Sequence, residues 1–406
     1  MAVVRPLHGV RYDPTQVGDL RQVVAPPYDV ISPAEQAALY EQSPYNVVRL
    51  ILPREADRAT AAADTLGRWI EARLLRQDPE PAVYPYVQTF RLPDGTTRQR
   101  EGILCRLGLE EFSSGVVRPH ERTFPGPKAD RLALLRATGA NLSPVFGLYS
   151  RPGESVRTWL GSVTETRPLI DITRPDGDRD RVWRVTDAAA IGRVQAALAS
   201  QTMFIADGHH RYESALAYWQ ERGRPEGASS VLAFVANMDQ EGLVILPTHR
   251  LVRGSLALAP AVLVVRLAER FTVEPLPAGR ARAAGELDCV LPDRRLRLRA
   301  RPGTADALHD VPPAVRGLDL TLLHGAILEP LLHVRADALA FTHDDGEAIQ
   351  AVEAGQAAAA FLLNAPSLAE VRAVCLAGEL MPEKSTYFYP KVLSGLLFDL
   401  VGPPWV

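Results

Sequence analysis

Apolar positions along the chain follow two spacings, one typical of helices and one typical of strands. The segment Ser32-Pro33-Ala34-Glu35 combines a capping box with proline at the first helical position, which predicts the start of a helix. Apolar residues at helical spacing predict a second helix over residues 56–76. Two strand-like runs, 84–91 and 100–107, flank the turn Pro93-Asp94-Gly95 and predict a hairpin.

Elsewhere the chain alternates between the two patterns. A short apolar run predicts a strand at 47–52, and another at 202–206 precedes a predicted helix at 212–222. A long helix is predicted at 319–332. The alternation indicates an α/β (α+β) fold. We divide the chain into an N-terminal α/β region, a core and a C-terminal α/β region, which are residues 1–102, 103–254 and 255–406; the last region begins where the sequence becomes rich in Ala, Arg and Leu.

Composition and charge narrow the class of protein. The chain has 406 residues, 47% of them apolar and 23% charged, with a formal net charge of −3, as in ordinary globular proteins. No basic stripe stands out, which disfavours DNA as the main ligand. The three cysteines (Cys105, Cys289 and Cys375) lack metal spacing and favour a reducing compartment. Without a signal peptide or a bilayer-length apolar run, we expect a cytoplasmic location.

Lysine is scarce in this sequence. Of 45 basic residues only three are lysines, Lys128, Lys384 and Lys391, and the others are arginines. An ammonium approaches a phosphate as a compact point charge, which a planar guanidinium does not reproduce well. The positions at which lysine is kept are therefore candidates for chemistry, with codon drift as the alternative.

The segment 204–213 is the strongest candidate for a site. An apolar strand ends there in Asp207-Gly208, and a helix begins within a few residues. Glycine allows close approach to the backbone, and a helix N-terminus offers N–H groups to an anion. The basic residues that follow would complement phosphate, and the aspartate would hold Mg²⁺. An Asp-Gly turn with two exposed histidines is the alternative. The predicted phosphate-binding motif consists of Asp207, Gly208, His209, His210 and Arg211.

A second candidate is the charged segment 118–131, which carries residues of both signs on a loop stiffened by three prolines. Glu121 would serve as a general base or a metal ligand. Lys128 and Arg131 would neutralise phosphate. A solvated charged loop is the alternative interpretation.

The third candidate is the segment 383–391, where two lysines, two hydroxyl groups and three aromatic rings lie close together. Such a set would clamp a small anionic ligand, with an aromatic edge strand as the alternative. A weaker signal is His249-Arg250 after a strand, which suggests a second phosphate-facing loop or a structural histidine. The sequence shows no GxSxG elbow and no Ser/His/Asp order, so hydrolase chemistry gains no support.

The order of these motifs resembles that of a known family. Pro119-His120-Glu121, the motif 207–211 and Lys384-Ser385-Thr386 recur in the same order in the free serine kinases of the ParB/sulfiredoxin-fold superfamily. With Pro-Pro-Tyr-Asp-Val-Ile at 26–31 and Gly-Pro-Lys-Ala-Asp-Arg at 126–131, the whole chain resembles the DUF1015 family, which is similar to a longer form of those kinases.

This resemblance implies a ParB/sulfiredoxin-like nucleotide-binding core and a Mg²⁺-dependent kinase that uses ATP or ADP. The leading reaction is the conversion of free L-serine to O-phospho-L-serine. Catalytic roles are implied for His120, Glu121, Asp207 and His210, and metal binding for Asp207 and Glu121. Nucleotide binding is implied for Asp207, Gly208, His209, His210, Arg211, His249 and Arg250. Substrate binding is implied for Lys128, Arg131, Lys384, Ser385, Thr386 and Lys391.

Two departures from the family pattern bear on the activity. No cysteine lies near Arg211, which excludes sulfiredoxin chemistry, and Tyr387-Phe388 replaces basic residues of the kinases, which leaves the acceptor open. The alternatives are a ParB-type nucleotide-binding or nucleotide-hydrolysing regulator, and a non-catalytic binding or scaffold protein. The expected partners are a nucleotide and serine or a similar hydroxy compound, without nucleic acid or membrane. CTP as a nucleotide and a homodimer are left open.

Overall fold

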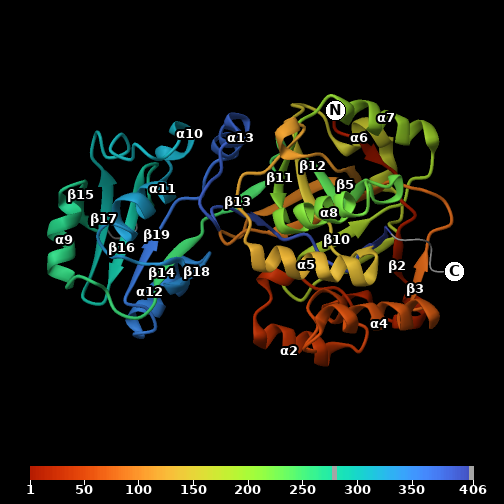
Figure 1. Cartoon of the computed structure of the whole chain (residues 1–406), viewed down its shortest axis with the longest axis horizontal. Coiled ribbons are helices and arrows are strands. Elements are labelled where there is room, and N and C mark those ends of the chain that lie inside the picture. The colour runs from red at the N-terminus through yellow and green to blue at the C-terminus, as the bar shows by residue number, and fades with distance from the viewer. Residues whose placement is uncertain (277–280, 402–406) are drawn as a thin grey trace. The chain divides into compact units, whose positions relative to one another are not determined.

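A computed structural model of the chain describes residues 1–276 and 281–401 (Figure 1). These residues cluster into two compact units. The first unit consists of Met1–Pro119, Thr123–Val244 and the chain from Pro390 onward, and the second consists of His120–Arg122 and Ile245–Tyr389. The division into three regions at residues 102 and 254 stays a prediction.

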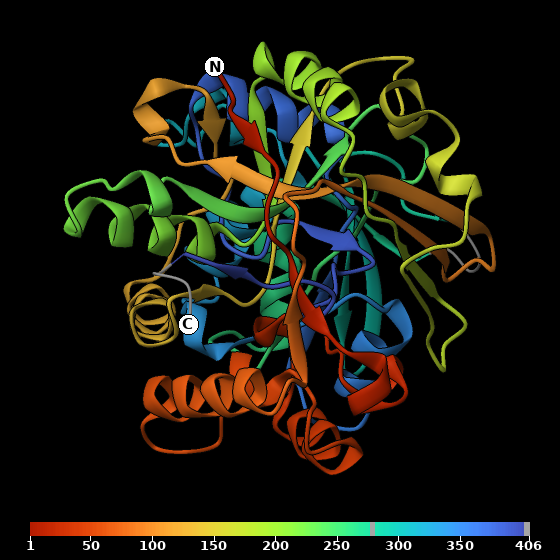
Figure 2. The same ribbon diagram turned by 90° about the vertical axis from the view of Figure 1, so that its right-hand side faces the viewer.

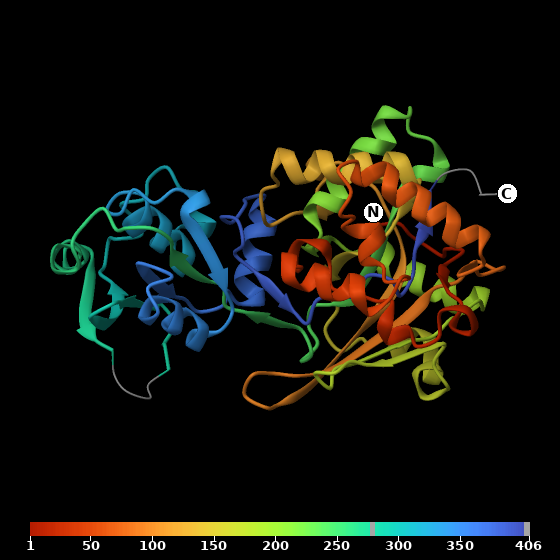
Figure 3. The same ribbon diagram turned by 90° about the horizontal axis from the view of Figure 1, so that it is seen from below.

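A mixed sheet forms the centre of the first unit, and nine strands of the described residues belong to it. Their order is β6-β11-β8-β12-β5-β4-β10-β9, with β1 added beside β5. β12 is parallel to β8 and antiparallel to β5. The β4–β5 hairpin (orange) extends as a long ribbon in Figure 3. The bounds are β1 (Val4–Arg5), β4 (Tyr84–Arg91), β5 (Thr97–Gly108), β6 (Val117–Arg118), β8 (Val145–Tyr149), β9 (Ile170–Thr173), β10 (Arg179–Val182), β11 (Met203–Asp207) and β12 (Ser230–Asn237).

Helices of the first unit bury their apolar sides against this sheet and against one another. Residues of α6, α7 and α8 share one apolar cluster with alternate residues of β5 and β12, as the two-residue period of a strand requires. The N-terminal helices (red to orange in Figure 2) form a second cluster with Leu134 of α5. The bounds are α1 (Pro14–Val17), α2 (Pro33–Gln42), α3 (Val48–Ile51), α4 (Arg58–Glu71), α5 (Pro125–Thr138), α6 (Val156–Leu160), α7 (Ala188–Ala199) and α8 (His209–Glu221).

Short elements complete the first unit. β2 (Val10–Tyr12) pairs with β3 (Leu75–Gln77), and β7 (Ala140–Asn141) pairs with β21 (Asp399–Leu400). The β7–β21 pair attaches the segment that begins at Pro390 to the first unit. The 3-10 turns are η1 (Leu20–Gln22), η2 (Tyr28–Val30), η3 (Phe112–Ser114), η4 (Gly161–Glu165) and η5 (Glu226–Ala228).

The second unit is built on an antiparallel sheet of order β15-β17-β16-β19-β14-β18. Cys289 and Phe361 point into the cluster that contains α9 and α11, whereas their neighbours Val290 and Leu362 point into the cluster of α12. Helices therefore cover both faces of this sheet. Its strands are β14 (His249–Val252), β15 (Phe271–Pro275), β16 (Glu286–Leu291), β17 (Arg294–Ala300), β18 (Leu339–Thr342) and β19 (Ala359–Leu362).

The remaining elements of the second unit are helices, turns and one short strand. The helices are α9 (Pro260–Ala268), α10 (Pro313–Arg316), α11 (Asp319–Leu323), α12 (Asp345–Glu353) and α13 (Leu368–Ala377). A π-helical turn, His324–Leu328, continues α11, and a 3-10 turn spans Ala336–Ala338. The strand β20 (Tyr387–Tyr389) pairs with β13 (Val244–Leu246), at which the chain passes from the first unit to the second.

The structure confirms the mixed α/β class and corrects several elements. Residues 47–52 were expected to form a strand but form the helical turn α3, because buried Asn46 accepts a hydrogen bond from the Val48 N–H at 2.9 Å and starts a turn. A short apolar run does not distinguish a strand from a buried helical turn. The predicted helix 319–332 is α-helical only over α11, and the predicted helix 56–76 ends at Glu71.

Other predicted elements are confirmed. The capping box of α2 is present, with both Ser32–Glu35 hydrogen bonds formed. The hairpin of β4 and β5 is antiparallel as expected. The longest helices that the structure describes, α4 and α5, have 14 residues each. Across residues 1–276 and 281–401, no helix has the combination of length and apolar character that crossing a bilayer requires.

Candidate functional site

In the first unit, the strongest sequence motif forms a strand–glycine–helix junction. β11 ends at Asp207, Gly208 is the N-cap of α8, and no side chain caps this helix end. Gly208 has a φ of 87°, and a Cβ atom there would lie 2.9 Å from Cζ of Arg211. The positive φ therefore favours glycine, and a Cβ atom would in addition have to displace the Arg211 guanidinium. The backbone N–H groups of the first helical turn give this junction the character of an anion site.

Two cations contact the carboxylate at this junction. The Lys391 ammonium donates to Oδ1 of Asp207, and the Arg211 guanidinium donates to Oδ2. The three side chains are each about a tenth exposed, at 10–11%. Burial opposes ionisation, but Lys391 and Arg211 outweigh it and hold the pKa of the Asp207 carboxyl well below its ordinary value. The ionised cluster carries one net positive charge.

A buried network positions Lys391. Arg100 is fully buried and donates to the Pro390 carbonyl at 2.5 Å, and Gln88 donates to the Lys391 carbonyl at 3.3 Å. Burial lowers the pKa of Arg100 to about 10. Sequence reasoning missed Gln88 and Arg100, although a polar pair at facing positions of a predicted hairpin, Gln88 opposite Arg100, is a signal that could have found them.

The start of α5 contacts α8 through two polar pairs. Lys128 pairs with Glu213 at 2.7 Å, and the Phe124 N–H donates to Nε2 of His210 at 2.9 Å. Both contacts join the N-terminal half of α5 to α8. Arg131, in contrast, is buried. It pairs with Asp130 at 2.5 Å, donates to the Ile51 carbonyl at 2.7 Å and lies with its guanidinium carbon 4.0 Å from the ring centre of Tyr28. Its contacts are those of a packing residue, and the substrate-binding role stays a prediction.

In the second unit, two of the sequence motifs meet. Oε1 of Glu121 accepts hydrogen bonds from the Ser385 N–H at 2.9 Å and the Thr386 N–H at 3.2 Å. Nε2 of buried His120 lies 2.7 Å from Oγ1 of Thr386. Lys384 has a φ of 55°, a left-handed conformation in this loop. The structure therefore brings the residues of the 119–121 and 384–386 motifs together, although they are more than 260 positions apart in sequence.

His249 and Arg250 lie in the interior of the second unit. Nε2 of His249 pairs with Asp345 at 2.7 Å, and Nδ1 accepts from the Leu363 N–H at 3.1 Å. The structural-histidine alternative describes these contacts. Arg250 is 1% exposed and donates to three carbonyl oxygens, those of Thr248, Glu383 and Lys384. Nucleotide binding by this pair stays a prediction.

The predicted site residues thus fall into two groups. The first unit holds residues 207–211, Lys128, Arg131 and Lys391, whereas the second holds His120, Glu121, His249, Arg250 and residues 384–386. Lys384 and Lys391, expected to bracket one substrate clamp, belong to different groups. Lys391 instead contacts Asp207.

The fit of these residues to Mg²⁺ depends on Asp207. Both of its oxygens are occupied by cationic side chains, which would repel a divalent ion. Within the described residues, no group of three or more His, Cys, Asp or Glu side chains is arranged to hold a metal ion. In this arrangement the first unit does not fit a metal ion held by Asp207, and the assignment of Asp207 and Glu121 as ligands stays a prediction.

Comparison with known proteins identifies the family. The family described as "Protein of unknown function (DUF1015)" matches residues 4–321. The chain belongs to this family. No curated protein matches this DUF1015 chain in sequence.

Several solved structures are similar to parts of this DUF1015 chain. A variant of a free serine kinase in complex with AMP is 16% identical with a TM-score of 0.37, and the match covers 67% of this chain and 84% of that one. A conserved hypothetical protein from Pyrococcus furiosus is 15% identical with a TM-score of 0.37, covering 70% and 92%. C-terminally truncated SbnI from Staphylococcus aureus is 13% identical with a TM-score of 0.39, covering 70% and 84%.

Proposed function

We propose that this protein is a small-molecule kinase that transfers a phosphoryl group from ATP or ADP to a hydroxyl group, with free L-serine as the leading acceptor. The order of the motifs at 119–121, 207–211 and 384–386, in which the chain resembles free serine kinases, supports this proposal. The geometry of the 207–211 junction is the observation that carries it.

The junction has the chemistry of a phosphate site. An uncapped helix N-terminus presents backbone N–H groups, and Arg211 and Lys391 add two cations at the same place. Asp207 holds these two cations in position without neutralising both. Phosphoryl transfer depends mainly on such positioning and on stabilisation of the phosphate oxygens, because the protein contributes little covalent chemistry. We assign this junction to the donor phosphates.

In the proposed reaction, Glu121 acts on the hydroxyl group of the acceptor. The hydrogen bonds that Glu121 accepts, from the Ser385 and Thr386 N–H groups and the Thr386 hydroxyl, all reach Oε1. No described residue donates a hydrogen bond to Oε2, which leaves that oxygen for the proton of a substrate hydroxyl. Magnesium enters the proposal only as an ion that the nucleotide phosphates carry, since Mg²⁺ in such sites is bound largely by phosphates and water. No step is derived through it.

The test is the formation of O-phospho-L-serine from L-serine with ATP or with ADP in the presence of Mg²⁺, detected by mass spectrometry. The parent chain is expected to form the product with at least one donor, and Glu121→Gln to lose turnover while still binding nucleotide. Asp64→Asn, on the exposed side of α4, is the matched control. A folded preparation that binds nucleotide but forms no phosphoserine would contradict the serine-kinase assignment. Nucleotide hydrolysis that no hydroxyl acceptor changes would favour the ParB-type alternative.

A further inference from the structure

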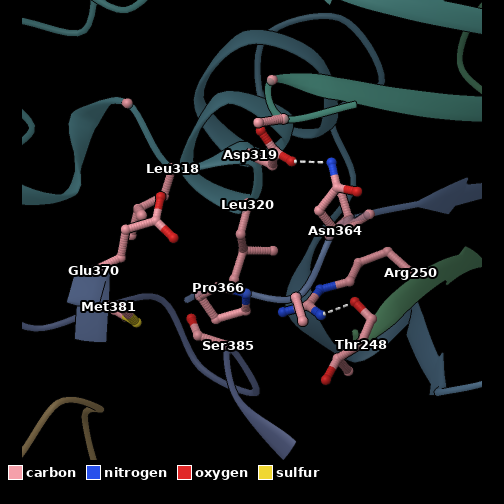
Figure 4. Close-up of a pocket in the computed structure, with 15 residues that line it drawn as sticks. Thr248, Arg250, Leu318, Asp319, Leu320, Asn364, Pro366, Glu370, Met381 and Ser385 are labelled. Atoms are coloured by element: carbon pink, nitrogen blue, oxygen red, sulfur yellow. Dashed lines mark hydrogen bonds between the residues drawn. The ribbon is translucent and has the colours of Figure 1, made fainter. Parts of the chain in front are cut away.

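A cavity of about 150 Å³ lies within the second unit (Figure 4). It is formed by residues of β14, the start of α11, the segment after β19 and the loop that contains Ser385. Its walls are largely apolar, from Leu318, Leu320, Pro366 and Met381. An engineered cavity of about this volume binds benzene, so there is room for a ligand of six or seven non-hydrogen atoms.

A buried positive charge lines one side of this cavity. The Arg250 guanidinium has only carbonyl oxygens as hydrogen-bond partners, and its Nε atom has none among the described residues. No carboxylate of the described chain lies within 4.0 Å of it, and the nearest aromatic partner is the Phe341 ring at 5.0 Å. Burial lowers the pKa of Arg250 to about 9, and the charge of Glu121 opposes this shift without offsetting it. A buried cation without a carboxylate partner is costly to the folded chain.

Negative charge lines another side. Asp319 accepts a hydrogen bond from the Asn364 amide at 2.9 Å but forms no ion pair with any described residue. Burial raises the pKa of the Asp319 carboxyl and nearby Glu370 adds to this effect, against the hydrogen bond from Asn364 and the charge of Arg282, which is not in contact with it. Glu370 caps α13 through Oε2, which accepts from the Ser367 N–H at 2.7 Å. Figure 4 shows Arg250 and Glu370 on opposite sides of the cavity, with Asp319 on a third side.

The two kinds of charge do not neutralise each other. Had Arg250 and Asp319 been placed in contact, they would form an ion pair as many arginines of this chain do, but they line one cavity and remain apart. A molecule that carries a carboxylate and an ammonium a few bonds apart would satisfy both. A simple anion would leave Asp319 without a partner, and a simple cation would leave Arg250 without one.

We propose that this cavity binds a small α-amino acid, whose carboxylate contacts Arg250 and whose ammonium contacts Asp319 and Glu370. The hydroxyl groups of Thr248 and Ser385 also line the cavity. Ser385 belongs to the loop that Glu121 holds through its backbone N–H, which connects the cavity to the candidate base. That the bound amino acid is the phosphoryl acceptor rests on the proposed kinase function, whereas binding itself does not.

The experiment measures binding of four probes to the full chain by isothermal titration calorimetry, with and without ADP. L-serine and L-alanine carry both charges, ethanolamine lacks the carboxylate, and 3-hydroxypropionate lacks the ammonium. We expect L-serine and L-alanine to bind, and each single-charge probe to bind at least about tenfold more weakly, the effect of losing one charged hydrogen bond. Equal binding of all four probes, or no binding of L-serine and L-alanine, would overturn the proposal.

Variants locate the binding in this cavity. Asp319→Asn keeps the bond to Asn364, and Glu370→Gln keeps a capping side chain. Each is expected to weaken L-serine binding at least about tenfold. Asp306→Asn, an exposed carboxylate of the same unit, is the matched control and is expected to bind as the parent does. Parent-like binding by both cavity variants overturns the proposal even if phosphoserine is formed. Binding that these variants abolish, in a chain that forms no phosphoserine, supports the cavity and overturns the kinase function instead.

Discussion

In the first unit, the Asp207 carboxylate contacts both Lys391 and Arg211, whereas in the second unit Arg250 and Asp319 line one cavity without contacting each other. All of these side chains are largely withdrawn from water. Paired charges in such surroundings depend on each other, and removal of one partner leaves the others uncompensated. Buried charges that do not contact a partner already incur the free-energy cost of burial, so removal of one leaves no newly unpaired charge. An ionised aspartate is therefore expected to stabilise the first unit, where cations contact it, and to destabilise the second, where none does.

Under the proposed activity, the two arrangements of charge serve ligand binding in different ways. At the 207–211 junction, Asp207 fixes two cations for an anionic ligand, and the site is assembled before the ligand arrives. In the cavity of the second unit, the ligand itself would complete the charge balance. Aspartate-to-asparagine substitutions separate these two situations because they remove charge with little change in shape.

The largest effect is expected for Asp207→Asn. The substitution leaves Lys391 and Arg211 as two buried cations in contact with a neutral side chain, which is expected to lower the free energy of unfolding by about 3–5 kcal/mol. Because the folded-state pKa of Asp207 lies below its unfolded value, its contribution is present above about pH 4 and is lost as the pH falls further. Urea denaturation of parent and variant at pH 7 and pH 3 measures both effects.

Asp64→Asn is again the control for this substitution and is expected to change stability by less than about 0.5 kcal/mol, as exposed positions do. Equal stability of Asp207→Asn and the control at pH 7 would mean that the two cations do not need the carboxylate.

A smaller loss is expected for Gly208→Ala. Alanine at a φ of 87° costs about 1–2 kcal/mol, and its Cβ atom must displace the Arg211 side chain 2.9 Å away. Since Arg211 is one of the two phosphate-directed cations, nucleotide affinity is expected to fall together with stability. Thermal unfolding and nucleotide titration of the same samples check both.

Gly192→Ala provides the matched control for Gly208→Ala. Gly192 lies inside α7 with open space around the added Cβ atom, so alanine is expected to stabilise the chain by about 0.5–1 kcal/mol. A parallel response of the two glycine variants would show that the junction does not depend on its backbone conformation.

A third prediction concerns acid stability of the second unit. Burial opposes ionisation of Asp345, but hydrogen bonds from His249 and Arg282 outweigh it and lower the pKa of this carboxyl. The stabilisation is therefore present above the unfolded pKa of about 4 and is lost as the pH falls below it. Because Asp345 is half exposed, solvent reduces the effect to less than about 1 kcal/mol. Asp345→Asn is expected to be slightly less stable than the parent in urea denaturation at pH 7, and the difference is expected to narrow as the pH falls to 3.

Elements of the fold could be predicted from the sequence where the residues that determine them are close together in the chain. The capping box of Ser32 and Glu35 and the turn in the β4–β5 hairpin are decided within a few residues, so short-range patterns identify them. The turn at 47–51 was not identified, because its conformation depends on Asn46 donating to the carbonyls of Gln22 and Val24, which are distant in sequence.

Only part of the candidate site could be predicted from the sequence. The strand–glycine–helix junction was visible because β11, Gly208 and α8 are consecutive. The contact of Lys391 with Asp207, at a separation of 184 residues, was not, and neither was the support from Arg100 and Gln88. Neither Asp319 nor Glu370 lies in one of the three candidate segments 118–131, 204–213 and 383–391. Each of these features depends on tertiary pairing of segments, which residue patterns along one sequence do not encode.

The smallest expected effect, and the one of opposite sign, is that of Asp319→Asn on stability. Burial raises the pKa of this carboxyl above its unfolded value, so its ionised form costs the folded chain free energy at pH 7, and the cost disappears as the pH falls through the raised pKa. Asparagine can accept the same hydrogen bond from Asn364 without this cost. The variant is therefore expected to equal the parent or exceed it by up to about 1 kcal/mol in urea denaturation at pH 7, and to match it at pH 3. A loss comparable to that of Asp207→Asn would show that Arg282 or another cation stabilises the ionised Asp319 carboxylate more than burial opposes it, and the contrast between the two units would then fail.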